Sequence, residues 1–253
     1  MSGGASTTPG GTPGFDAWLD AFFASYYRHR PVDATFVGVH AYDHRLPDLS
    51  PDGTAALKAE MEALLRRLGT LPSERLSEAQ TIDRRLAEGF LRIQLWESDS
   101  HHFQRGNPST YTGEAVFGII SLLQREFAPL EERLESAAAR MEAIPALLRT
   151  ATAAVRTAPA AWIARAIREC DGALALFPAG IATLLAERGV EHPRASAAAE
   201  RAAAAFAEFR RYLDIDLRAR ATDAYACGEE PFALLLRWGH CLDEDARTIA
   251  AYA

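Results

Sequence analysis

Apolar residues recur with the spacing of an α-helix along most of the chain. A helix with one buried face carries apolar residues at i, i+3, i+4 and i+7, whereas a half-buried strand alternates every second residue. The helical spacing is found in five stretches. Their apolar positions are Leu57, Met61, Leu64, Leu65 and Leu68; Ile82, Leu86, Phe90, Ile93 and Trp96; Leu130, Leu134, Ala137, Met141, Ile144 and Leu148; Trp162, Ile163, Ala166, Ile167, Cys170, Leu174 and Phe177; and Ala202, Phe206, Phe209, Leu213 and Leu217. Because no convincing alternating stretch is found, the sequence predicts an all-α fold of about eight packed helices.

Prolines and glycines predict where some of these helices bend or end. Pro145 lies inside the third stretch and should kink or break it, because proline lacks a backbone N–H. Pro178 and Gly180 should end the fourth stretch. Residues Val116–Phe127 are apolar on nearly all sides, so we expect this helix at the centre of the core.

The linker signals are all short, and one all-helical domain is therefore predicted over residues 15–253. Residues 1–14 are rich in Gly, Ser, Thr and Pro and should form a flexible N-terminal tail. They lack the basic start and apolar stretch of a signal peptide. No continuous apolar run approaches the roughly 18 residues of a membrane span. The three cysteines are widely spaced, as is typical of reduced thiols, and we expect a cytoplasmic protein.

Composition and charge exclude several classes of protein. Apolar residues make up 49% of the chain and charged residues 24%, which is typical of a soluble globular protein. The formal net charge of -7 argues against binding to nucleic acid or to an anionic membrane. The chain has no P-loop, no G-x-G-x-x-G fingerprint and no G-x-S-x-G nucleophile motif.

Four residues are candidates for acid–base chemistry without a metal. They are His40, Asp43, His44 and Glu114. His40 and His44 have the i, i+4 spacing that would bind a divalent metal on a helix. The proline-rich turn that follows them makes a continuous helix doubtful and favours a hydrogen-bonded end of an element. We therefore expect no metal site here.

The segment around Asn107 connects a long amphipathic helix to the buried one. Asn107 can cap the helix that follows, and this is its structural interpretation. Tyr111 can instead face a cleft, where it would contact a substrate together with Asn107 and with Trp96 of the preceding helix. Both interpretations remain open at the level of sequence.

A series of short motifs, in a fixed order, carries a resemblance to a known family. The series begins with Asp-Ala-Thr-Phe-Val-Gly-Val-His-Ala-Tyr-Asp (33–43) and Arg45-Leu-Pro-Asp-Leu-Ser50, followed by a Leu-rich helix and Ile82-Asp83. It continues with Asn107-Pro108, Tyr111, Leu122 to Phe127, Arg133-Leu134, Met141-Glu-Ala-Ile-Pro145, Leu147-Leu148 and Gly228-Glu-Glu-Pro-Phe232. Over residues 15–253 the chain resembles the N-terminal half of the bacterial family called domain of unknown function 885, which is zinc metallopeptidase-like.

The resemblance implies a zinc site that this sequence does not contain. In the family, zinc is expected on a later helix with a His-Glu-x-x-Pro-Gly-His pattern. No histidine of this chain is followed by glutamate, so neither that pattern nor H-E-x-x-H is present. A zinc-activated water needs about three protein ligands and a general base. No cofactor is therefore expected in this chain, and zinc only if a separate catalytic half supplies the ligands.

Three functions remain consistent with the sequence. In the first, the chain is a helical lobe of a metallopeptidase-like protein, which forms a substrate-cleft wall or pairs with a catalytic half. Its partner would be a second polypeptide or another copy of the chain. In the second, it is a self-sufficient helical protein that binds a peptide or small molecule between helices. In the third, it is a repurposed, metal-independent enzyme that uses the four acid–base residues.

Overall fold

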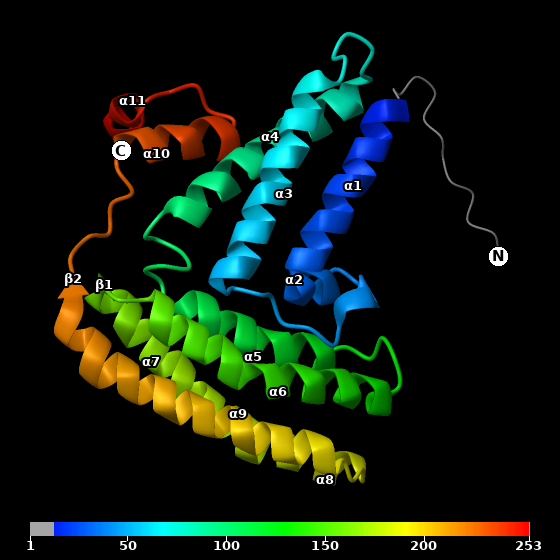
Figure 1. Ribbon diagram of the computed structural model, residues 1–253, viewed down its shortest axis with the longest axis vertical. Coiled ribbons are helices and arrows are strands. Elements are labelled where there is room, and N and C mark those ends of the chain that lie inside the picture. Colours follow the sequence, from blue (N-terminus) through cyan, green and yellow to red (C-terminus); the bar gives the residue numbers. More distant parts are fainter. Residues whose placement is uncertain (1–12, 253) are drawn as a thin grey trace. The chain divides into compact units, whose positions relative to one another are not determined.

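A computed structural model describes residues 13–252, and most of them are helical (Figure 1). The all-α prediction is confirmed. The described residues group into two compact units. Unit 1 comprises residues 13–26, 56–99 and 227–252, and unit 2 comprises residues 27–55 and 100–226. The predicted N-terminal tail lies outside the described residues except for Pro13 and Gly14, which begin the first helix.

Unit 1 is built from three long helices and the C-terminal segment. The elements are α1 (Pro13–His29), α3 (Pro51–Thr70), α4 (Glu78–Asp99), α10 (Glu229–Leu234), the π-helical η5 (Leu235–Gly239) and α11 (Ala246–Ala251). Phe15, Trp18 and Phe22 lie on one face of α1 and are buried. The indole N–H of Trp18 donates to the carbonyl of Leu64 at 3.0 Å, so a buried polar group on α1 is satisfied by the backbone of α3.

The predicted buried face of α4 is partly wrong. Ile82 and Leu86 are each 54% exposed, whereas Ala87, Gly89 and Leu91 are buried. The reason is a close contact that periodicity does not encode: a methyl group on Gly89 would lie 2.5 Å from the carbonyl oxygen of Trp238. The helix therefore turns a small-residue face toward η5. The apolar face predicted for α3 is confirmed at Met61, Leu64 and Leu68, which are buried.

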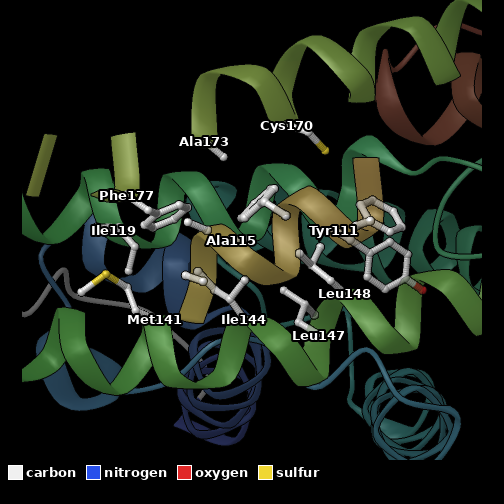
Figure 2. Close-up of a cluster of buried hydrophobic side chains, with 14 of the residues drawn as sticks. Tyr111, Ala115, Ile119, Met141, Ile144, Leu147, Leu148, Cys170, Ala173 and Phe177 are labelled. Atoms are coloured by element: carbon white, nitrogen blue, oxygen red, sulfur yellow. The ribbon is translucent and has the colours of Figure 1, made fainter. Parts of the chain in front are cut away.

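Unit 2 contains the other helices and the larger hydrophobic core. Its elements are α2 (Pro31–Phe36), the 3-10 turn η1 (His40–Tyr42), α5 (Ser109–Leu123), α6 (Leu130–Ala154), β1 (Ala158–Pro159), α7 (Ala160–Ala175), the π-helical η2 (Leu176–Gly180), α8 (Ile181–Arg188), α9 (Pro193–Arg211), the π-helical η3 (Tyr212–Leu217), the 3-10 turn η4 (Arg218–Arg220) and β2 (Ala221–Thr222). Helix α5 packs on both α6 and α7, and α9 packs on α6. Figure 2 shows the side chains of α5, α6 and α7 that meet in this core.

Helix α5 has the central place expected of it, but not all of its sides are covered. Ala115, Ile119 and Leu122 are fully buried, while Phe117 on the same helix is 53% exposed. The apolar faces predicted for α6, α7 and α9 are buried along most of their length. Tertiary packing therefore follows the helical periodicity closely in unit 2.

Pro145 does not break its helix, and Pro178 and Gly180 do not end theirs. Helix α6 continues through Pro145 from Leu130 to Ala154 without a break. The helix that Pro178 and Gly180 should end instead widens into the π-helical η2 and continues as α8. A π segment shifts the hydrogen-bond pattern by one residue, and it can therefore accommodate a proline, which has no N–H to donate. The helical run ends at Gly189, whose φ of 63° is the left-handed conformation typical of a glycine cap.

A short parallel pair of strands was not predicted. Ala158–Pro159 pairs with Ala221–Thr222, at two residues per strand. Segments this short carry no alternating pattern, so periodicity had no signal to detect.

Candidate functional site

A buried arginine organises the polar interior of unit 2. Arg140 on α6 has no exposed surface. Its Nη1 donates to the carbonyl of Gly118 at 2.6 Å and to Ser121 Oγ at 3.1 Å. Its Nη2 donates to the carbonyl of Pro31 at 3.0 Å and to Thr35 Oγ1 at 2.8 Å. One guanidinium thereby joins α2, α5 and α6.

The pKa of Arg140 reflects its burial. Desolvation lowers this pKa to about 10, against the opposing charges of Asp43 and Glu114. The group therefore stays protonated at neutral pH and requires compensating negative charge. The unpartnered Nε of the same side chain is buried as well, so the positive charge is not fully satisfied by hydrogen bonds.

The compensating negative charge comes from Asp43, which is linked to Arg140 by the hydroxyl of Thr35. The side chain of Asp43 is buried, and its Oδ1 lies 2.6 Å from Thr35 Oγ1. Its Oδ2 lies 2.9 Å from Nδ1 of His40. A continuous hydrogen-bonded line thus runs from Arg140 through Thr35 and Asp43 to His40. We call these four residues the Arg140 network.

His40 ends the network at the surface. Its ring stacks on Phe127 with ring centroids 3.9 Å apart and an interplanar angle of 13°. His40, Asp43, His44 and Phe127 line a pocket of about 280 Å³ together with Ala128, Glu132, Arg133 and Ser136. An aspartate that holds Nδ1 of a histidine orients the other ring nitrogen, as in many general bases. Three of the four predicted acid–base residues are therefore brought together.

The fourth, Glu114, does not line this pocket. It lies on α5, where burial and the carboxylate of Asp33 raise its pKa to about 7, against the opposing charges of Arg30 and Arg140. Its electrostatic partners are Arg30, Asp33 and Arg140 rather than His40. Three of the four predicted residues therefore line the pocket, and Glu114 lies at a desolvated position elsewhere in the same unit.

Two of the predicted substrate contacts, Asn107 and Tyr111, form hydrogen bonds with the backbone. Tyr111 is fully buried, and its hydroxyl donates to the carbonyl of Gln104 at 2.9 Å (Figure 2). Asn107 Oδ1 accepts the backbone N–H of Ser109 at 3.1 Å, in a turn directly before α5, whose N-cap residue is Pro108. A buried ring cannot touch a ligand without rearrangement, so the geometry speaks against a substrate role for Tyr111. Trp96 belongs to α4 of unit 1, whereas Asn107 and Tyr111 belong to unit 2.

One further cluster of possible ligands lies at the start of α9. Oxygen atoms of Glu131 and Glu135 and a ring nitrogen of His192 lie within 4.8 Å of one another. His192 Nε2 is 3.3 Å from a carboxylate oxygen of Glu135. However, Nδ1 of the same ring accepts the N–H of Ala195 at 3.1 Å and caps the helix. The neutral ring therefore carries its proton on Nε2, and the nitrogen that faces the carboxylates has no lone pair for a metal.

A family model described as "Bacterial protein of unknown function (DUF885)" matches residues 31–253. The chain belongs to this family. The expected resemblance is thereby confirmed. No curated protein matches the chain.

A solved structure shares the fold of this DUF885 chain. It is described as a putative lipoprotein of unknown function from Shewanella oneidensis. The match has a TM-score of 0.77 and 24% sequence identity, and covers 87% of this chain and 42% of the other. This DUF885 chain thus spans less than half the length of that relative.

One helical run of the DUF885 chain is long and apolar enough to cross a membrane by length and composition alone. It spans Ala160–Arg188, where no membrane span was expected from the sequence. Ile163, Cys170 and Phe177 of this run are buried in the core of unit 2. Core helices pass the same test, so the run is weak evidence for a span.

Sequence reasoning missed the residues at the centre of the site. Arg140 and Thr35 were not candidates, although both now connect the predicted residues to the core. A signal was present for Arg140, which interrupts a row of buried apolar positions between Ala138 and Met141. A charge on the buried face of a helix requires a partner, and that requirement was the available clue.

Proposed function

We propose that this chain is a helical lobe of a metallopeptidase-like protein, which forms a wall of the substrate cleft and does not hydrolyse peptides by itself. The observation that carries the proposal is the partial match: the chain aligns with 42% of a related structure and carries the family's motifs without a His-Glu dipeptide. Hydrolysis would need zinc ligands from a catalytic half outside residues 1–253.

The chemistry of the Arg140 network supports a scaffold role. Both carboxylate oxygens of Asp43 are in use, one by Thr35 and one by His40. A buried arginine requires a nearby anion, and removing either partner would leave an uncompensated buried charge. Charge compensation of Arg140 therefore explains why a carboxylate lies here, and no catalytic role is needed to explain it.

A peptidase assay of the purified chain tests the proposal. The chain is incubated with a quenched fluorescent peptide library, with and without added Zn²⁺. We expect no hydrolysis above the rate without protein in either condition. Hydrolysis that survives repeated purification and is abolished by a chelator would contradict the proposal, because the chain would then hold a working metal centre of its own.

The repurposed enzyme is the second candidate, and the His40–Asp43 pair in an open pocket favours it. It predicts a metal-independent activity that is lost when His40 is replaced by Asn. His101→Asn is the matched control, because His101 is exposed and does not line the pocket. An esterase and amidase substrate panel that gives no activity, or an activity equal in both variants, removes this candidate.

Composition and the state of the cysteines bear on the cellular location. We propose a cytoplasmic protein, on the grounds of composition and of three free cysteines. The competing location is the cell envelope, since the related protein from Shewanella oneidensis is described as a putative lipoprotein. Fractionation of the native cells with an antibody against this chain decides between the two locations.

A further inference from the structure

A second groove of unit 2 lies away from the Arg140 network. It has a volume of about 650 Å³ and is formed by the C-terminal part of α6, the residues that follow it and the second half of α9. Its apolar lining comes from Pro145, Leu148, Ala205 and Phe209. A groove of this volume with an apolar floor has the dimensions of a small-molecule site.

The rim of the groove is positively charged. Arg149, Arg156 and Arg201 line it together with one carboxylate, Glu208, which leaves a formal charge of +2 (three minus one). Arg201 reaches Glu142 outside the groove at 3.4 Å. Within residues 13–252, Arg149 and Arg156 form no ion pair.

Three arginines outside the groove are paired with carboxylates. Arg165, Arg188 and Arg210 each contact a carboxylate at 3.2 Å or less. In a chain with a net charge of -7, acidic partners are plentiful. Two arginines that remain without a partner and line one groove therefore create a local positive potential that suits an anionic ligand.

We propose that this groove binds an amphipathic carboxylate, in which a carboxylate group is attached to an apolar chain. A guanidinium group matches the planar carboxylate with two parallel hydrogen bonds, and Thr152 on the lining offers a hydroxyl donor. The apolar floor would cover the chain of the ligand. Two sources fit this chemistry, a fatty acid and the C-terminus of a peptide that ends in an apolar residue. The inference does not depend on the proposed peptidase-lobe function.

Calorimetric titration of the full chain tests the proposal with defined probes. The probes are decanoate, the dipeptide N-acetyl-Leu-Phe with a free carboxylate, and the same dipeptide amidated at its C-terminus. Binding of at least one carboxylate, with one site per chain, is expected, and the amidated dipeptide should not bind. Decanoate alone would indicate a fatty-acid site, and the dipeptide alone a peptide C-terminus.

Variants locate the binding site. In Arg149→Gln/Arg156→Gln the affinity for the bound carboxylate should fall by roughly tenfold or more, since two charge-assisted interactions are lost. Arg165→Gln/Arg188→Gln, with two arginines outside the groove, should bind as the original chain does. Circular dichroism confirms that both variants are folded. No saturable binding of either carboxylate, equal affinity in both double variants, or equal binding of inorganic phosphate would overturn the proposal.

Discussion

Arg140 is a charged side chain with no exposed surface, and its environment explains why it is tolerated. Four hydrogen bonds to α2 and α5 compensate for the lost hydration, and Asp43 compensates for the charge through Thr35. Such a network is costly when incomplete, because each buried polar group then lacks a partner. At the residue scale, the pocket of His40 is thus one end of a structural network.

Replacement of Arg140 by Met should destabilise the protein strongly. The change removes the five hydrogen bonds of the guanidinium and leaves Asp43 buried without its positive charge, so we expect a loss of about 3 kcal/mol in the free energy of unfolding. Arg149→Met is the matched control on the same helix, because Arg149 is exposed and should change stability by less than about 0.5 kcal/mol. Urea unfolding followed by circular dichroism measures both, and equal losses would show that Arg140 has no special role.

Glu114 should make stability depend on pH. Its pKa is raised from 4.5 to about 7 in the folded protein, so the folded state holds a proton that the unfolded state has released. This contribution is fully present below pH 4.5 and is lost as the pH rises toward 7 and above. The free energy of unfolding should therefore fall between pH 5 and pH 7.5.

The variant Glu114→Gln isolates that effect. It stays neutral at every pH, so its stability should fall less than that of the original chain over the same range. Glu200→Gln, which removes an exposed carboxylate of α9, should keep the original slope. Urea unfolding at pH 5.0, 6.0 and 7.5 gives the comparison. The same slope in Glu114→Gln and in the original chain would show that Glu114 titrates normally.

At the scale of elements, the local sequence pattern predicts the existence of a helix more reliably than the face that the helix buries. The apolar faces of α3, α6 and α9 follow from their spacing, because each packs a continuous row of side chains. For α4 the buried face is set by η5, a segment more than 130 residues later in the chain. The periodicity of α4 carries no information about such a long-range contact. The same limit explains Arg140, whose partner carbonyl at Pro31 lies 109 residues away.

Gly89 tests how η5 is held against α4. In Gly89→Ala the new methyl group would lie 2.5 Å from the Trp238 carbonyl, and backbone has to move. We expect a loss of about 1–3 kcal/mol and faster proteolysis of residues 227–252. Gly172→Ala in α7 is the control, because no atom lies within 4 Å of its added methyl group. That variant should be stabilised by about 0.5–1 kcal/mol. Unchanged proteolysis of Gly89→Ala would show that η5 is not packed as described.

His192 tests whether the cluster at the start of α9 is a helix cap or a metal site. As a cap, His192→Ala should cost about 1 kcal/mol, the usual loss when a capping side chain is removed. Equimolar Zn²⁺ should leave the Tm of the original chain unchanged, because Nε2 carries the ring proton. Scanning calorimetry measures both. A rise in Tm with Zn²⁺ that disappears in His192→Ala would instead identify a metal site with Glu131 and Glu135.

At the scale of the whole molecule, the family and the all-helical class could be predicted from the sequence, and both are confirmed. The candidate site could be predicted in part. His40, Asp43 and His44 are close in sequence and line one pocket, whereas Glu114, which was grouped with them by chemical type alone, does not line it. Residue type says what a side chain can do, but only packing decides which side chains meet.

The metal content of the purified chain, measured by elemental mass spectrometry together with its mass in solution, tests most directly whether this chain lacks a catalytic metal centre of its own. We predict far less than one zinc ion per chain, in the monomer and in any oligomer. Stoichiometric zinc that remains after dialysis against a weak chelator would contradict the proposed role. The ligands would then have to come from this sequence, and the carboxylates beside His192 and the pocket of His40 would be the first places to look.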